Sequence, residues 1–198
     1  MIMRDRKIGV AVIGLGVGAQ HALAYSSTGL CQLRWVHDLD VEKARKMAIT
    51  LEADGVAESY EQVLDDPDVQ AVSIASYDDV HFDQVVAALN AGKHVFVEKP
   101  LCETVDELET VKRAWWKHEG ALKLSSNLIL RDAPIYRWLK QKIEDGDFGE
   151  LYAFDGEYLY GRLQKITCGW RKNIEGYSVI LGGAVHLVDL MLWLTGER

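Results

Sequence analysis

Cysteine, positive charge and long hydrophobic runs are all scarce in this chain of 198 residues, and each shortage argues against a class of protein. The three cysteines, Cys31, Cys102 and Cys168, are odd in number and widely spaced. Disulfide frameworks and zinc sites use paired or clustered cysteines instead. We therefore expect no disulfides and no metal site, and a reducing, cytoplasmic location.

Lysine and arginine number 22 against 30 aspartates and glutamates, which gives a net charge of −8. This excess of negative charge argues against a nucleic acid or an anionic membrane as a partner. The longest apolar stretch, 179–194, carries His186 and Asp189 and falls short of the roughly 20 residues of a membrane span. We interpret this stretch as a buried helix of a globular protein.

A glycine-rich turn near the N-terminus is the most informative pattern. An apolar run at 8–13 leads into it, and a helix-like stretch and a second apolar run ending on Asp38 follow. This is the order of strand, phosphate-binding turn, helix and acidic residue in a dinucleotide site. Gly14 permits a tight turn, Gly16 leaves room for a pyrophosphate, and Ala19 is small enough for the helix to pack against the strand. A glycine turn that serves packing alone is the alternative.

Asp38 stands roughly 24 residues after Gly14, where dinucleotide sites carry the residue that binds the adenosine ribose. Its carboxylate can accept hydrogen bonds from both ribose hydroxyls, and its charge would repel a 2′-phosphate. The expected cofactor is therefore NAD rather than NADP.

Up to residue 127, short β-branched runs alternate with helical patterns. Strands are predicted at 8–13, 33–37, 71–75, 94–97 and 122–125, and helices at 18–27, 41–52, 60–64, 79–91 and 105–118. Parallel strands need crossover helices, so this alternation predicts an α/β fold with a doubly wound, mostly parallel sheet. Gly92 is expected to end one helix, and Thr104 with Glu107 to cap the start of another.

The pattern changes after residue 127, which predicts a domain boundary there. A helix is predicted from Pro134 to about residue 144, a long strand with aromatic residues at 150–161, and a final helix at 183–195. One strand and a few helices cannot cover a sheet face, and an unpaired edge invites association. We expect that the chain is a fragment or that partners cover this part.

Two elements carry side chains suited to proton transfer. Lys99 follows the strand at 94–97, at the edge where ligands of parallel sheets bind, and its ammonium can hydrogen-bond a substrate hydroxyl. A surface lysine paired with Glu98 is the alternative. His186 lies on the final apolar helix, where Asp189, one turn away, offers it a purely structural partner. These two side chains lack a third metal ligand in the sequence.

The stretch 158–171 is the predicted substrate-contacting segment. Its aromatic and basic side chains are of the kind that bind phosphorylated or nucleotide sugars, namely Tyr160, Arg162, Lys165, Trp170 and Arg171. A solvated loop that covers the sheet is an equally good interpretation.

Four elements together resemble the glucose–fructose oxidoreductase / inositol dehydrogenase (Gfo/Idh/MocA) family, namely the glycine turn, the strand ending in Asp38, the Glu98-Lys99-Pro100 tripeptide and the stretch from Gly182 to Asp189. The resemblance covers essentially the whole chain. It implies an NAD-binding Rossmann domain over 1–127, then an incomplete C-terminal α/β domain of the Gfo/Idh/MocA type over 128–198 for substrate binding and homo-oligomer formation. The implied activity is NAD(P)-dependent oxidation or reduction of a sugar, cyclitol or nucleotide sugar.

Carried over position by position, the resemblance also implies roles for single residues. The implied cofactor-binding residues are Gly14, Gly16, Ala19, Asp38, Ser76, His81 and Glu98. Lys99 is implied to bind the substrate and to share proton transfer with His186, and the Lys99–Pro100 bond is expected to be cis. The chain departs from the family at Tyr77 and Asp78, where proline and asparagine are usual, and at Gly182, where many members carry an aspartate.

Two other functions stay open at this point. Some family members use bound NAD for a transient oxidation during glycoside cleavage, without net redox change. A non-catalytic dinucleotide-binding or assembly protein is the other alternative, because glycine replaces the aspartate at 182.

Overall fold

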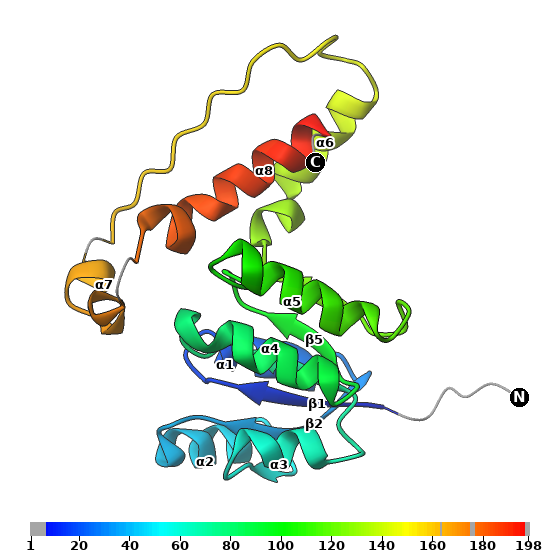
Figure 1. Ribbon diagram of the computed structural model, residues 1–198, viewed down its shortest axis with the longest axis vertical. Helices are drawn as coiled ribbons and strands as arrows, with labels where there is room; N and C mark the ends of the chain where they lie inside the picture. Colours follow the sequence, from blue (N-terminus) through cyan, green and yellow to red (C-terminus); the bar gives the residue numbers. More distant parts are fainter. Residues whose placement is uncertain (1–6, 163, 175–176, 197–198) are drawn as a thin grey trace, which may run out of the picture. The chain divides into compact units, whose positions relative to one another are not determined.

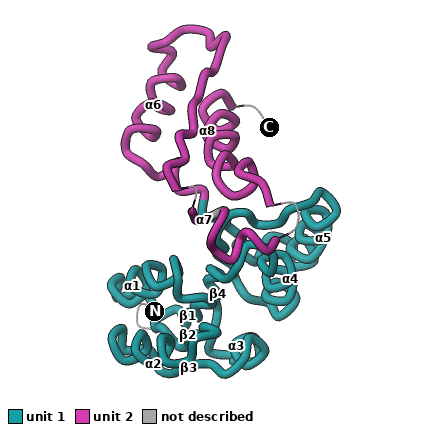
Figure 2. The backbone as a smooth tube through the Cα atoms, turned by 90° about the vertical axis from the view of Figure 1, so that its left-hand side faces the viewer, with its two compact units in different colours: residues 1–127 teal, residues 128–198 magenta. Residues whose placement is uncertain are grey.

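The computed structural model describes residues 7–162, 164–174 and 177–196 (Figure 1). The chain divides into two units, residues 1–127 and 128–198 (Figure 2). Each unit is described on its own below.

The first unit is a six-stranded parallel sheet with helices on both faces. Its strands are β1 (Ile8–Ile13), β2 (Cys31–His37), β3 (Gly55–Val56), β4 (Ala71–Ile74), β5 (His94–Val97) and β6 (Leu124–Ser126), in the order β3-β2-β1-β4-β5-β6. The helices are α1 (Gly18–Ser27), α2 (Val41–Thr50), α3 (Tyr60–Asp65), α4 (His81–Asn90) and α5 (Val105–Trp116), with a 3₁₀ turn, η1 (Asp78–Val80), before α4. The strand order reverses between β1 and β4, so the predicted doubly wound α/β fold is confirmed.

Both faces of the sheet are buried, which explains why the strand sequences are runs of apolar residues. Along β1, Ala11 and Ile13 pack into a core with α3, α4 and α5, whereas Val12 packs into a second core with α1 and α2. Successive side chains of a strand point to opposite faces, so a central strand needs apolar residues at every position. The strand β3 was not predicted, because two residues carry no periodicity.

The predicted helix ends are also found. Thr104 and Glu107 form a reciprocal capping box at the start of α5. Gly92, with a φ of 73°, follows the last residue of α4 and its C-cap. Each device satisfies backbone groups that a helix end leaves unpaired.

The second unit is mainly helical in the part that the structure describes. It contains η2 (Ile129–Asp132), α6 (Pro134–Glu144), the short α7 (Gln164–Thr167), η3 (Trp170–Asn173), the π-helical turn η4 (Ile180–Ala184) and α8 (Val185–Thr195). The stretch 179–194, interpreted above as a buried helix, is buried only in part. Leu190 and Leu194 are buried, whereas Val188 and Ile180 are exposed.

The strand predicted at 150–161 is wrong for this structure. The segment runs between α6 and α7 without pairing to any strand in the described part of the chain (Figure 1). Tyr152 and Leu159 are 98% and 89% exposed. Alternating aromatic residues favour a strand, but a strand forms only where a partner supplies the ladder of hydrogen bonds. None of the described helices is both long and apolar enough to cross a membrane.

Candidate functional site

The predicted cofactor residues of the first unit lie where its parallel strands end. Gly14 follows β1 and donates its N–H to the carbonyl of His37, the last residue of β2, at 2.8 Å. Glu98 follows β5 and donates its N–H to the carbonyl of Ile74, the last residue of β4, also at 2.8 Å. These bonds bring the glycine turn, Asp38 and the Glu98–Lys99 pair to one edge of the sheet. Open α/β sheets bind ligands at this edge, where the strand order reverses.

The glycine turn fits a pyrophosphate. Gly14 has a φ of 80°, and a Cβ there would lie 2.7 Å from the carbonyl carbon of Ala75, so only glycine fits. A Cβ on Gly16, by contrast, would meet nothing within 4 Å. In the part of the chain that the structure describes, no side-chain hydrogen bond caps the start of α1, which follows this open position directly. Uncapped helix N–H groups beside open space are suited to an anion.

The small residue that lets α1 approach β1 is Gly18 and not Ala19. A Cβ on Gly18 would lie 3.0 Å from the Cβ of Ala75 and 3.1 Å from a methyl group of Val12. Ala19 is only half-buried. The closest approach to the sheet is therefore at Gly18, the position before the Ala19 to which the sequence analysis assigned it. Contact of Ala19 with a cofactor stays a prediction.

Asp38 is held by three hydrogen bonds. Its Oδ2 accepts from the N–H of Leu15 at 2.7 Å and from the ammonium of Lys43 at 2.9 Å, and its Oδ1 accepts from the N–H of Asp40 at 2.9 Å. Burial alone would raise the pKa of this carboxyl, but the three donors outweigh burial and hold the pKa below its usual value. Asp38 is therefore a fixed anion beside the glycine turn.

Glu98 belongs to a buried polar network that the sequence analysis did not identify. Its Oε1 lies 3.1 Å from Nε2 of His21 on α1 and accepts from the amide of Asn127 at 2.6 Å. The other ring nitrogen of His21 lies 3.0 Å from the hydroxyl of Ser73 on β4. Burial acts to raise the pKa of Glu98, but His21 and Asn127 overcome it and lower that pKa. The network connects the helix after the glycine turn to the residue before Lys99.

His81 and Ser76 make contacts within the protein. The ring of His81 is completely buried, and its Nδ1 donates to the carbonyl of Pro100 at 2.8 Å. The carbonyl only accepts, so the proton sits on Nδ1. The hydroxyl of Ser76 donates to the amide oxygen of Gln84 at 2.6 Å. In this structure His81 thus supports the segment that carries Lys99, and it presents no surface to a ligand. The predicted cis bond between Lys99 and Pro100 is confirmed.

In the second unit, His186 lies in the first turn of α8, half-buried. Asp189, considered above as its structural partner, accepts two hydrogen bonds from the guanidinium of Arg131, at 2.8 Å and 2.5 Å. This fork geometry fixes α8 to η2. The carboxylate of Asp189 is therefore committed to Arg131.

The space beside Gly182 is filled by a tyrosine. A Cβ at position 182 would overlap the Tyr177 hydroxyl and lie 2.5 Å from the ring carbon that bears it. The guanidinium of Arg171 donates from Nε to this hydroxyl at 2.9 Å and lies over the ring of Trp170, 4.1 Å from its centre. Tyr177, which the sequence analysis missed, thus places a phenol oxygen where an aspartate side chain at 182 would begin.

The predicted substrate-contacting residues are divided by their exposure. Tyr160, Trp170 and Arg171 are half-buried, and Tyr160 stacks on Tyr158 with ring centres 6.0 Å apart. Arg162 and Lys165 are exposed, as in the alternative of a solvated loop. Among residues 7–162, 164–174 and 177–196, no three potential metal-ligating side chains come together as a metal site requires.

Comparison with known proteins agrees with this arrangement. The model of the oxidoreductase family with an NAD-binding Rossmann fold matches residues 8–125, and the model of the GFO/IDH/MocA C-terminal domain matches residues 136–198. The chain belongs to the Gfo/Idh/MocA family. Its first unit is accordingly an NAD-binding Rossmann domain, as predicted.

Individual relatives are dehydrogenases and reductases of sugar-like compounds. The chain is 28% identical to levoglucosan dehydrogenase of Pseudarthrobacter phenanthrenivorans over 97% of this chain and 52% of that protein. It is 34% identical to 1,5-anhydro-D-fructose reductase of Ensifer adhaerens over 70% of this chain and 41% of that protein. A solved levoglucosan dehydrogenase in complex with NADH and L-sorbose superposes with a TM-score of 0.79 at 25% identity, covering 96% of this chain and 53% of the other. The chain thus spans about half the length of the curated relatives that it matches.

Proposed function

We propose that the protein is an NAD-dependent oxidoreductase that acts on a secondary alcohol, or the corresponding ketone, of a sugar, cyclitol or nucleotide sugar. The observation that carries this proposal is the edge of the sheet where the open glycine turn, the anion of Asp38 and the Lys99 segment meet. The relatives named above are dehydrogenases and reductases of sugar-like compounds, and they support the substrate class. NAD, when bound, supplies the hydride acceptor.

The geometry of the first unit supports a proposed role for each cofactor residue. Gly14 shapes the turn, Gly16 and Ala19 face the pyrophosphate, and Asp38 accepts from the ribose. Ser76 is proposed to contact the nicotinamide half and Glu98 to contact the cofactor, and His81 is proposed to position the Lys99 segment through its hydrogen bond to the Pro100 carbonyl.

Proton transfer is assigned to His186 and Lys99. When the substrate C–H bond breaks with its electron pair, the hydroxyl group must lose its proton. His186 is proposed to accept that proton, and the ammonium of Lys99 is proposed to hydrogen-bond a substrate hydroxyl. The aromatic and basic side chains from Tyr160 to Arg171 surround the rest of the substrate.

Asp38 sets the cofactor preference in this proposal. The wild-type protein is expected to bind NAD at least about tenfold more tightly than NADP, a difference of roughly 1.4 kcal/mol. Asp38→Asn keeps the shape but removes the repulsion of the 2′-phosphate, so the two dissociation constants should become similar. Calorimetric titration with each dinucleotide measures this. Equal affinities in the wild type would show that Asp38 does not face the ribose.

The Tyr177 hydroxyl, which lies where a side chain at position 182 would begin, is proposed to take the part in proton transfer that the family resemblance gives to an aspartate at that position. Tyr177→Phe keeps the ring packed on Gly182 but removes the oxygen that Arg171 holds, so kcat should fall about tenfold or more while NAD affinity stays constant. Tyr152→Phe, at a 98% exposed tyrosine, is the control. In the double variant Tyr177→Ala/Gly182→Asp, the vacated space admits a carboxylate and turnover should partly return. Full activity of Tyr177→Phe would contradict the assignment.

The proposed function is tested by incubating the protein with NAD and each member of a panel of inositols, anhydrosugars and nucleotide sugars. The absorbance of NADH is followed over time. Formation of NADH with at least one panel member is the expected result. Release of a free sugar from a glycoside without net NADH formation would favour the glycoside-cleaving alternative. Binding of NAD without any turnover would favour a non-catalytic protein.

A further inference from the structure

Asp38, the carboxylate proposed to bind the ribose, forms an ion pair with Lys43. Lys43, in the first turn of α2, places its ammonium 2.9 Å from Oδ2 of Asp38. The two side chains differ in exposure, 14% for Asp38 and 40% for Lys43. The carboxylate is therefore fixed in the edge of the sheet, while the ammonium reaches it from the solvent side.

Asp38 has too few acceptor positions to bind a ribose diol and keep all three of its present donors, and Lys43 is the donor that can move away. A carboxylate has about four lone-pair positions, and three donors already use three of them. Two of these donors, the N–H groups of Leu15 and Asp40, belong to the backbone and cannot leave. A ribose diol needs two acceptor positions, so the long side chain of Lys43 has to move when both hydroxyls bind.

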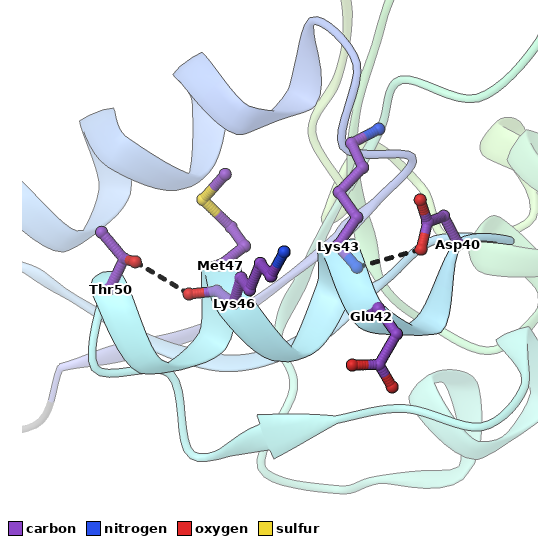
Figure 3. A pocket seen from close by; sticks show the side chains of 6 residues that line it. All are labelled: Asp40, Glu42, Lys43, Lys46, Met47 and Thr50. Atoms are coloured by element: carbon purple, nitrogen blue, oxygen red, sulfur yellow. Dashed lines mark hydrogen bonds between the residues drawn. The ribbon is translucent and has the colours of Figure 1, made fainter.

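Lys43 has an open space beside it. A surface pocket of about 310 Å³ lies along α2 and is lined by its N-cap Asp40 and by Glu42, Lys43, Lys46, Met47 and Thr50 (Figure 3). Glu42 and Lys43 point in opposite directions from the helix in this view, and Glu42 pairs with Arg45. The neighbouring carboxylate therefore does not hold the Lys43 ammonium, which can leave Asp38 for another anion nearby.

We propose that Lys43 is a specificity-determining residue that weakens the discrimination against NADP imposed by Asp38. With NAD, Asp38 accepts from the ribose hydroxyls and Lys43 gives way. With NADP, the Lys43 ammonium turns to the 2′-phosphate, and Asp38 keeps its two backbone donors. The pair thus makes NADP a poorer but usable ligand. This inference rests on the NAD site alone and is independent of the substrate.

The test compares dissociation constants for NAD and NADP by calorimetric titration at one fixed ionic strength. Lys43→Met should weaken NADP binding about tenfold and change NAD binding by less than about threefold, so the preference for NAD widens. Lys43→Arg keeps a cation and should keep the wild-type ratio. Lys46→Met removes the same charge from the same pocket and is the matched control, because in the described structure Lys46 makes no ion pair with Asp38.

An equal change in both affinities for Lys43→Met, or the same loss for Lys46→Met, would overturn the role of Lys43. Failure of the wild-type protein to bind NAD at all would overturn the inference together with the cofactor site. Normal NAD binding with no turnover of any sugar would contradict the proposed function and leave the expected result for Lys43 unchanged.

Discussion

His186→Ala is expected to lower kcat by about 10²–10⁴-fold, the usual contribution of a positioned general acid or base. The imidazole is the group assigned to accept the hydroxyl proton, and alanine leaves that proton to solvent. NAD affinity should stay within about threefold of the wild type, because every proposed cofactor contact belongs to the first unit. Steady-state kinetics and calorimetric titration measure the two quantities separately.

The control for this variant is His118→Ala, which removes a half-buried histidine that has no place in the proposed site. It should keep wild-type turnover. Unaltered turnover in His186→Ala would remove His186 from the mechanism. A loss of NAD affinity equal to the loss of turnover would show that the substitution disturbs the cofactor site instead.

Substitution of Gly14 should mainly lower the stability of the protein, whereas substitution of Gly16 should mainly weaken NAD binding. Gly14→Ala forces a Cβ against the backbone of Ala75 at a φ of 80°, so the free energy of unfolding should fall by roughly 2–5 kcal/mol. Gly16→Val projects into open space and should leave the free energy of unfolding within about 1 kcal/mol. The valine side chain nevertheless occupies the approach of the pyrophosphate, so the dissociation constant for NAD should rise at least about 100-fold, or roughly 2.7 kcal/mol.

Urea unfolding and NAD titration of the two variants check this pair of predictions. If Gly14→Ala unfolds at the wild-type urea concentration, the close approach to Ala75 does not constrain the turn. Wild-type NAD affinity in Gly16→Val would mean that the pyrophosphate binds elsewhere.

Much of the first unit was predictable because its signals are local. Strands buried on both faces must be apolar throughout, crossover helices must alternate with them, and the acid after the second strand must reach the turn after the first. Asp38 accepting from the N–H of Leu15 is the direct outcome of that register. The capping residues Thr104 and Glu107 act within one helical turn, so they too could be identified from the sequence.

The features that escaped prediction depend on contacts between distant residues. His21 and Glu98 are 77 positions apart, and neither lies in a pattern that indicates the other. The overlap of Tyr177 with the space beside Gly182 follows from the path of a loop, which has no periodicity. The segment 150–161 has a strand-like pattern, but pairing requires a second strand, which local sequence cannot supply.

Deuterium transfer from the substrate carbon to the dinucleotide tests the proposed hydride transfer directly. The protein is incubated with NAD and with an inositol or anhydrosugar deuterated at its carbinol carbons, and the dinucleotide is analysed by mass spectrometry and NMR. One deuterium at C4 of the reduced nicotinamide is expected for each ketone formed, and His186→Ala should lose most of this signal. Conversion of the sugar without deuterium in the dinucleotide would contradict hydride transfer to NAD.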